Sequence, residues 1–447
     1  MTECNSNLLF NYYPKRQLSV DFAGGNLTSD AGLLLVRQAD ETLSLTKGLA
    51  SCIADWRNPF FITHTLTDQV RQRVYQICAG YEDADDCDYF RRDPLFKTLC
   101  DRLPEKDADL ASQPTMSRLE NRVSKEDLAR LRKYFVDQFI ASYTEPPEEL
   151  ILDVDGWADP THGCQQMTFF HGFYDQYMYY PVQINEAQSG CPLVVHLRPG
   201  NSHAGKGIRG ILAWLIWRLR QTWPSVRITL RADSGFSLPE LMKICERLKI
   251  HYVFGIAGNN VLKRKVDYLL DCARLQYHQT GCKARLFDDV YYCAGSWAEP
   301  RRVIMKAEWL EKGENARFLV TNRLEEAQEL YDQIYVQRAE ACENRIKEFK
   351  LGLKGDRLSC HDFEANQFRL ILFQAAYWLM LSIRKAAAGT PLERAQVSRI
   401  REQLIKVAAQ VKETVRRVWI HLASSFRWQD LFNLINTRLA MPRFSKG

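Results

Sequence analysis

Two apolar runs end in acidic side chains, and these acids are the residues of the chain best suited to chemistry. Residues 150–156 read LILDVDG and place Asp153 and Asp155 two positions apart, and residues 228–235 read ITLRADSG, with Asp233 just before a glycine turn. Because side chains alternate along a strand, Asp153 and Asp155 are expected on the same face. Taken singly, Asp153 or Asp233 is more simply interpreted as the cap of a turn; together the acids indicate a shared site.

Carboxylates that converge repel one another, so their joint ionisation requires a counter-charge. Mg²⁺ supplies it, because this hard ion prefers oxygen ligands and binds substrate phosphates directly. Two such ions about 3.5–4 Å apart stabilise the attacking and leaving oxygens of a phosphoryl displacement. The acids therefore favour a phosphodiester-cleaving site with two Mg²⁺ ions, for which Mn²⁺ can substitute.

A third acid, Glu343, lies in a long helical pattern. At about 100° per residue, Lys347 and Lys350 fall near the face of Glu343, one and two turns later, and Tyr335 falls there two turns earlier. Arg338 is displaced from this face on an ideal helix. A glutamate followed by lysines at this spacing also forms simple exposed ion pairs, so the sequence leaves both interpretations open.

The elements that must position these acids follow an α/β pattern. Short apolar runs bounded by glycine, proline or asparagine predict strands, and the amphipathic stretch 207–223 predicts a helix between the third strand and the fourth. Three strands, a helix and a strand are typical of an α/β fold. Further strand-like runs follow up to about residue 322, and a helix is expected from about 324 to 350. Acids at the ends of neighbouring strands of such a sheet can meet at one edge.

Helical patterns flank this region on both sides. Residues 1–145 contain amphipathic stretches that begin with capping residues, and the acidic, proline-bearing segment 144–150 is typical of a linker. Residues 363–447 also read as helical, with a break at 386–391. We therefore expect a helical N-terminal region, a core at 146–362 and a helical C-terminal region.

Length and composition set the class of protein. A chain of 447 residues with 46% hydrophobic and 26% charged residues predicts a globular protein of two or three domains. No run approaches the roughly 20 apolar residues that span a bilayer, and the N-terminus lacks the layout of a signal peptide, so we expect a cytosolic protein. The 13 cysteines include no CxxC pair, which favours reduced, packed thiols over a zinc site or disulfides.

Basic residues gather towards the C-terminus. From residue 384 onwards, 13 lysines and arginines, Arg416 and Arg417 among them, face four acids, so this segment carries +9 while the rest of the chain carries −3. Clustered cations favour a polyanionic partner through counterion release. An exposed, solvated helical face is an equally good explanation of the basic segment taken alone.

Several motifs resemble a known family. They are LDVDGWADPTHGCQQ at 152–166, LRPGNSHAGKGIRG at 197–210, ITLRADSGF at 228–236 and ENRIKEFKLGLKGDRLSCHDFEANQFRL at 343–370. These stretches resemble the DDE transposases of bacterial insertion sequences, specifically the insertion-sequence 1380 family. N-terminal stretches such as VDFAGGNLTSDAGLLLVRQ are similar to the same family, so the resemblance covers nearly the whole chain, from about Val20 to Val411.

The resemblance implies a ribonuclease-H-like catalytic core with a β-strand insertion between the second and third acids. It assigns Asp155 as the first acid, Asp233 as the second and Glu343 as the third, and it leaves Asp153 as a supporting acid. The spacings of 78 and 110 residues leave room for the insertion, expected at about 256–322, in the second interval.

Related insertion-sequence transposases carry a Tyr-x2-Arg-x3-Glu-x6-Lys signature around the third acid. Tyr335, Arg338, Glu343 and Lys350 reproduce it with one extra residue between arginine and glutamate, so the placement of Arg338 depends on a bulge or on where the helix begins. Glu340 is a weaker competitor for the third acid, because no lysine stands seven residues after it.

Two tryptophans separate this chain from a simple match. Trp157 stands where the family usually has threonine, two residues from the first acid, and it either reshapes the approach of DNA or packs. Trp297 lies in the expected insertion, where related enzymes place a tryptophan that stacks on an extruded base. A tryptophan buried in a β-hairpin is the commoner explanation of Trp297.

The resemblance implies a transposase that binds the terminal inverted repeats of its element, cleaves DNA at the element's end and joins the freed 3′-hydroxyl to target DNA. Lys350 and Arg338 would hold phosphate near the cleaved bond, and Lys347, Arg416 and Arg417 are further candidates for DNA contacts. The N-terminal region would bind the DNA end, a homodimer would join two ends, and the protein would work near the bacterial nucleoid. A catalytically decayed DNA-binding relative and a metal-dependent nuclease without strand transfer remain as alternatives.

Overall fold

The computed structural model describes residues 8–203, 205 and 207–441, with the side chains of residues 339–342 left out. The chain divides into two compact units. The first, which we call the helical unit, comprises Met1–Ser51, Asp55–Leu119 and Ser382–Pro442; the second, the sheet unit, comprises Cys52–Ala54, Glu120–Leu381 and Arg443–Gly447. Each unit is described by itself.

Short capped helices build the N-terminal part of the helical unit. They are α1 (Leu33–Leu43), α2 (Leu45–Ser51), α3 (Leu66–Ala79), α4 (Asp86–Phe90), α5 (Pro94–Leu99) and most of α6 (Gln113–Arg122). A capping box between Thr65 and Asp68 begins α3, and Gly80, in the left-handed conformation with φ +97°, ends it. These features confirm the helix predicted from the amphipathic pattern there.

The C-terminal segment returns to the helical unit and differs from the all-helical prediction. It contains α14 (Val397–Ile400), the π-helix η5 (Arg401–Ile405) and α15 (Gln429–Ala440), but β15 (Ala409–Glu413) and β16 (Val418–Leu422) form a hairpin between them. Apolar residues alternate along β15 and β16, a period-2 pattern that suits strands. The hairpin pairs with β3 (Leu27–Thr28), so both ends of the chain share one small sheet.

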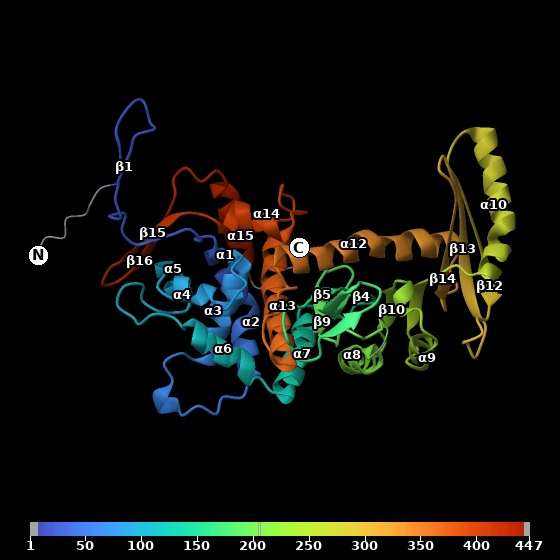
Figure 1. The fold of residues 1–447 in the computed structure, drawn as a ribbon, viewed down its shortest axis with the longest axis horizontal. Coiled ribbons are helices and arrows are strands. Elements are labelled where there is room, and N and C mark those ends of the chain that lie inside the picture. The colour runs from blue at the N-terminus through green and yellow to red at the C-terminus, as the bar shows by residue number, and fades with distance from the viewer. Residues whose placement is uncertain (1–7, 204, 206, 442–447) are drawn as a thin grey trace, which may run out of the picture. The chain divides into compact units, whose positions relative to one another are not determined.

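A mixed eight-stranded sheet forms the centre of the sheet unit (Figure 1), with the strand order β12-β13-β14-β11-β10-β4-β8-β9. Its first five strands along the chain are β4 (Glu149–Gly156), β8 (Val182–Glu186), β9 (Pro192–His196), β10 (Arg227–Ala232) and β11 (His251–Ile256). Strands β4, β10 and β11 are parallel and β8 is antiparallel to β4. This order is that of a ribonuclease-H-like fold, as the family resemblance implied.

Helices cover this sheet on both sides. They are α7 (Lys125–Ala141), α8 (Ile208–Thr222), α9 (Pro239–Arg247) and most of α13 (Phe363–Ala386). In Figure 1, α8 and α9 lie on one side of β4 and β10, and α12 (Val336–Lys347) lies on the other. Helix α7, which begins with a capping box at Ser124, was expected in the N-terminal region but belongs to the sheet unit.

The insertion between β11 and α12 begins with a helix that the sequence reading missed. Helix α10 (Asn260–Thr280) precedes the antiparallel strands β12 (Ala284–Tyr292), β13 (Arg301–Leu310) and β14 (Gly313–Thr321). Its buried residues, such as Leu262, Val266 and Leu269, recur at helical spacing. Strand β14 pairs with β11, so the β-strands of the insertion continue the central sheet.

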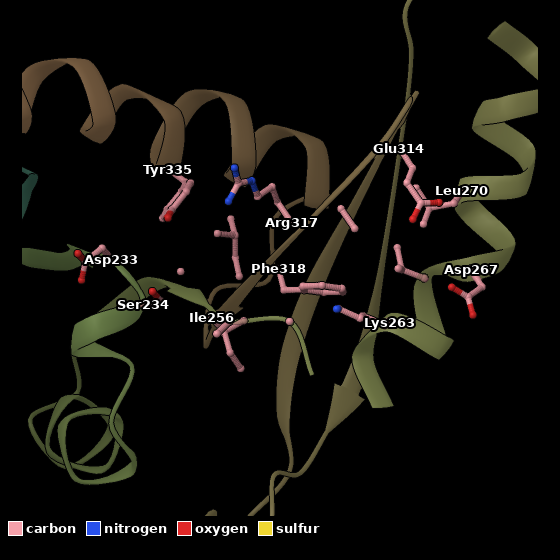
Figure 2. Close-up of a pocket in the computed structure, with 16 residues that line it drawn as sticks. Asp233, Ser234, Ile256, Lys263, Asp267, Leu270, Glu314, Arg317, Phe318 and Tyr335 are labelled. Carbon is pink, nitrogen blue, oxygen red and sulfur yellow. The ribbon is translucent and has the colours of Figure 1, made fainter. Parts of the chain in front are cut away.

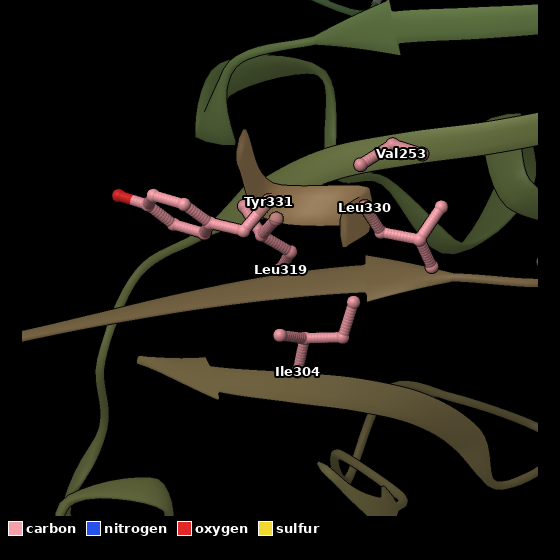
Figure 3. Packing of buried hydrophobic residues seen from close by; sticks show 5 residues of the cluster. All are labelled: Val253, Ile304, Leu319, Leu330 and Tyr331. Atoms are coloured by element: carbon pink, nitrogen blue, oxygen red, sulfur yellow. The ribbon is translucent and has the colours of Figure 1, made fainter. Parts of the chain in front are cut away.

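The long helical segment after the insertion is interrupted by π-helices. It consists of α11 (Ala327–Glu329), the π-helix η3 (Leu330–Tyr335), α12 and the π-helix η4 (Glu348–Gly352). Figure 3 shows how η3 is anchored: Leu330 and Tyr331 pack with Val253, Ile304 and Leu319, which belong to β11, β13 and β14. This cluster ties the start of the helical segment to the sheet.

A three-stranded sheet lies between β4 and β8 in the chain and was not predicted. Its strands are β5 (Asp159–Pro160), β6 (Phe169–His171) and β7 (Gln176–Tyr179), in the order β5-β7-β6. Phe170 lies opposite Tyr177 in the β6–β7 hairpin. Searched over the described residues, the helices include none long and apolar enough to cross a membrane.

Candidate active site

The first two predicted acids lie side by side at one edge of the central sheet. Strands β4 and β10 are parallel neighbours, and their register pairs Val154 with Ala232. One residue further on, this register places Asp155 opposite Asp233, at the usual spacing of adjacent strands of about 4.8 Å. The carboxyl ends of parallel strands are where open α/β sheets place their chemistry, and this register supports the expectation that the two acids meet at one edge of the sheet.

Local hydrogen bonds orient each carboxylate. Asp155 Oδ1 accepts the backbone N–H of Gly156 at 2.8 Å, and Asp233 Oδ1 accepts that of Gly235 at 2.9 Å. Asp233 thereby caps the short 3₁₀-helix Ser234–Phe236. The turn-cap interpretation is therefore correct for Asp233, and it is compatible with a second role because a carboxylate has two oxygens.

Arg338 of α12 is the counter-charge of the first acid. Its Nη2 lies 3.0 Å from Asp155 Oδ2, and both side chains are largely shielded from solvent. Arg338 is also within 3.4 Å of the carbonyl oxygen of Val154. Arg338 therefore contacts the first acid despite the extra residue in the signature. An ideal helix had predicted that Arg338 lies away from the face of Glu343.

Asp153 anchors the helix and the two strands rather than facing solvent. Its carboxylate is fully buried and binds Arg231 through two hydrogen bonds, at 2.6 and 2.8 Å. Arg345 of α12 approaches the same carboxylate to 3.4 Å, and Arg231 also donates to the carbonyl oxygen of Ile334 at 2.6 Å. Because α12 reaches both Asp153 and Asp155, the two acids share the face of β4 that the sequence predicted.

Glu343 does not join the two strand acids in this structure. Arg338 and Arg345 are seven residues apart, about two turns, and both reach β4, so they mark the face of α12 that lies against the sheet. Glu343 stands two residues before Arg345, about 160° around the helix from it, and its side chain is exposed. The side chain of Glu340, the weaker competitor, lies outside the described residues.

The positions of these acids determine whether they can bind a divalent ion. Asp155 and Asp233 offer carboxylate oxygens, which Mg²⁺ and Mn²⁺ prefer. Within the part of the chain that the structure describes, no group of three or more His, Cys, Asp or Glu side chains is placed to hold a metal. The two strand acids therefore fit a divalent ion as part of its ligand set. Among the described residues, no third carboxylate completes this set.

A cavity of about 600 Å³ opens beside Asp233. Figure 2 shows Asp233 and Tyr335 at one end and Lys263 of α10 at the other, with Arg317 of β14 between them. A Cβ added at Gly255 would lie 2.5 Å from the Tyr335 hydroxyl, so only glycine admits this tyrosine. Burial raises the pKa of Tyr335 above its usual value.

The two lysines of the signature have different surroundings. Lys350 donates from Nζ to the carbonyl oxygen of Ala158 at 3.0 Å, whereas Lys347 is exposed. Lys350 lies in the π-helix η4, whose wider turns change the helical phase after α12. The ideal-helix argument that put Glu343, Lys347 and Lys350 on one face therefore does not carry through to Lys350.

Neither tryptophan presents a free ring to a substrate here. Trp157 is buried and packs on Phe349, with ring centroids 5.7 Å apart. Trp297 is 8% exposed; it packs edge-to-face on Tyr292 and lies under the guanidinium of Arg301. Both arrangements support the packing alternative that the sequence left open for each tryptophan.

The predicted basic contacts of the C-terminal segment lie in the helical unit. Arg416 and Arg417 occupy the turn between β15 and β16, and both are exposed. The guanidinium of Arg417 lies over the ring of Trp419, 5.6 Å from its centroid. The two cations are therefore presented on a hairpin turn rather than along a helical face.

Sequence reasoning missed a buried acid next to the site. Asp159 is fully buried, and neither of its carboxyl oxygens has a hydrogen-bond partner among the described residues. Burial raises its pKa well above the usual value; the charge of Asp356 raises it further, while Lys350 and Arg369 oppose the shift. Its place four residues after Asp155 was the only sequence signal, since a lone aspartate before proline normally indicates a turn.

Comparisons with known proteins were made on the whole chain. Residues 10–443 match the profile of the family described as "Transposase DDE domain group 1". No curated protein matches the chain. Among solved structures it is similar to the cryo-EM structure of a piggyBac transposase synaptic complex with hairpin DNA, with 13% sequence identity, a TM-score of 0.42, and coverage of 85% of this chain and 80% of that one.

Proposed function

The chain belongs to the family of transposases with a group 1 DDE domain, and from that membership we propose that it is the transposase of an insertion sequence of the 1380 type. Members of the DDE family are DNA-cleaving and DNA-joining enzymes that use divalent metal ions. The finer assignment is that this chain binds the terminal inverted repeats of its element, cuts there and joins the ends to target DNA. It would act as a homodimer in the bacterial cytosol, because two ends must be joined.

One observation carries the proposal: the parallel strands β4 and β10 of a ribonuclease-H-like sheet pair up to Val154 and Ala232, and Asp155 and Asp233 directly follow this last pair. These acids would hold Mg²⁺ at the scissile phosphate. The bound ions would activate the attacking oxygen and stabilise the leaving one. Arg338 would supply a counter-charge to Asp155, because its guanidinium lies 3.0 Å from that carboxylate.

Glu343 is proposed as the third acid from its place in the signature. To reach the strand acids from its exposed position, α12 must turn about its axis. The π-helices η3 and η4 border α12 on both sides, and π-helical turns are frequent where helices change register at functional sites. Lys347 would then contact the DNA backbone, and Lys350 would position the loop at Ala158.

The test uses the purified full-length protein and a plasmid that carries the chain's own gene with its natural flanking DNA. We expect Mg²⁺-dependent nicks at the ends of the element and joining of those ends to a second plasmid. Asp233→Ala should do neither, while Asp271→Asn, which alters an exposed acid on α10, should do both. The same reactions in Mn²⁺ test the substitution of the ion.

Other outcomes would contradict the proposal. Nicking without joining would indicate a metal-dependent nuclease. Absence of Mg²⁺-dependent nicking would indicate a catalytically decayed DNA-binding relative. Equal nicking by Asp233→Ala would show that the nicks do not come from this acid pair.

A further inference from the structure

The β6–β7 hairpin carries an unusual concentration of exposed aromatic rings. Five of them lie within residues 169–177: Phe169, Phe170, Phe173, Tyr174 and Tyr177. The most open are Phe173 at 85%, Tyr177 at 61% and Phe170 at 50% of their full exposure. Large apolar groups gathered on one surface mark an interaction site more often than scattered ones do.

The rings form a continuous path from this hairpin to the strand acids. Tyr180 is buried at the inner end, and a Cβ added at Gly156, the residue after Asp155, would lie 3.3 Å from its Cζ. The Tyr174 ring lies 5.9 Å from that of Tyr180, and the Phe173 ring lies 5.0 Å from that of Tyr174. The ring contacts from Phe173 through Tyr174 to Tyr180 therefore lead from the hairpin to Gly156, the residue after Asp155.

The inner end of this path lies close to the strand acids. The guanidinium of Arg198 lies over the Tyr180 ring, 4.9 Å from its centroid. Burial raises the pKa of Tyr180, the neighbouring Tyr174 raises it further, Arg198 lowers it, and the charge of Asp233 adds a smaller upward contribution. Tyr180 is thus near both strands that carry the acids.

The outer rings are arranged to accept a further ring. Phe170 and Tyr177 meet edge-to-face, with centroids 5.6 Å apart and planes at 67°, and Phe173 and Tyr174 meet at 85°. An edge-to-face pair uses one face of only one ring, so flat faces remain for stacking. Residues 160–180 contain no lysine or arginine, so the hairpin is suited to planar bases rather than to phosphates.

We propose that the β6–β7 hairpin is a stacking platform for unpaired nucleobases of the DNA strand that enters the Asp155–Asp233 site. This inference rests on the proposed function, because the strand must pass the acids. A base stacked on an aromatic side chain gains about 1–3 kcal/mol. The platform would hold strand ends that have separated from the duplex, leaving the acids to act on the adjoining phosphate.

The experiment measures binding of a forked duplex with one unpaired oligothymidine arm, in Ca²⁺ to prevent cleavage. We expect Phe173→Ala with Tyr177→Ala to weaken binding of the fork about tenfold and binding of the blunt duplex much less. The conservative pair Phe173→Tyr and Tyr177→Phe should retain binding. Tyr291→Ala, an exposed aromatic on β12 at 70% exposure, should behave as wild type.

Photo-crosslinking locates the contact. With 5-iododeoxyuridine in the unpaired arm, crosslinked peptides should contain residues 169–177. Equal loss of fork and blunt binding, or crosslinks confined to other peptides, would overturn the platform. So would loss of dimerisation by the double alanine variant with fork binding unchanged, since the hairpin would then contact a second copy.

The two proposals fail separately in this design. If the wild-type protein cuts its element's ends but the double alanine variant binds the fork normally, only the platform is wrong. If the wild-type protein binds neither duplex nor fork and never nicks DNA, the proposed function itself is wrong.

Discussion

The strand acids and the helical acid of this site are positioned by different physical means. Asp155 and Asp233 follow paired strands, so backbone hydrogen bonds and register place them together. Glu343 sits on α12, whose rotational setting depends on the contacts of Arg338 and Arg345 and on the π-helices at both ends. The position of a residue at a strand end is fixed by the pairing of that strand within the sheet. The direction of a side chain on a helix also depends on the rotation of the helix, and one inserted residue rotates all later side chains by about 100°.

The largest effect is expected from removing the charge of either strand acid, Asp155 or Asp233. Asp155→Asn and Asp233→Asn each keep the shape of the side chain and remove its charge, so nicking of the element's ends should fall about 10³-fold or more, because residues that act as one unit fail together. Initial rates of plasmid nicking in Mg²⁺ measure this. The double variant should be no worse than either single one; independent, multiplying losses would show that the acids do not act as a unit.

The second prediction concerns the helical acid. Glu343→Gln should lower the nicking rate about 100-fold or more if α12 turns to bring it to the strand acids, whereas Glu340→Gln should change the rate less than about threefold. The same plasmid assay compares the two variants. The reverse result would identify Glu340 as the third acid. It would also show that Glu343 is not the glutamate of the signature, although Lys350 follows it at the expected spacing.

The third prediction contrasts Asp153 with its neighbour Asp155. Asp153→Asn leaves the buried guanidinium of Arg231 without its bidentate partner, so the free energy of unfolding should drop by about 3 kcal/mol. Urea unfolding followed by circular dichroism measures it. Asp155→Asn serves as the matched control and should cost less, because Asp155 makes one hydrogen bond to Arg338 where Asp153 makes two to Arg231, and its side chain is 19% exposed where that of Asp153 is fully buried. An equal cost for the two variants would contradict the anchoring role of Asp153.

The smallest effect concerns the unpaired buried acid. The raised pKa of Asp159 means that the folded state favours the protonated form. Its contribution to stability is complete below the unfolded value of about 3.9 and is lost as pH rises towards the folded pKa. Asp159→Asn cannot ionise, so its stability relative to wild type should rise between pH 5 and pH 7. Urea unfolding at the two pH values measures this; a constant difference would show that Asp159 titrates normally.

The sequence predicted the parts of the fold that local patterns encode. Apolar runs ending at glycine indicated β4 and β10, and alternation put Asp153 and Asp155 on one face, which the contacts of α12 confirm. The family resemblance led to the ribonuclease-H-like core. The strand order itself depends on which runs pair over long distances, and this information is not local.

The features that sequence reasoning missed also have physical reasons. The small sheet β5-β7-β6 was missed because its strands are only two to four residues long, too short for a period-2 pattern. Helix α10 was passed over because the expected insertion was read as strands throughout. Arg231 and Arg345 were not singled out, since a single arginine shows no partner in sequence; their common partner, Asp153, is 78 and 192 residues away.

The most direct test of the account is binding of Mn²⁺ to the protein without DNA, measured by electron paramagnetic resonance. Mn²⁺ reports occupancy of the acid pair independently of cleavage. We expect the wild-type protein to bind Mn²⁺, Asp155→Asn and Asp233→Asn each to lose this binding, and Asp271→Asn to keep it. Undiminished binding by either strand-acid variant would contradict the claim that Asp155 and Asp233 form one divalent-ion site.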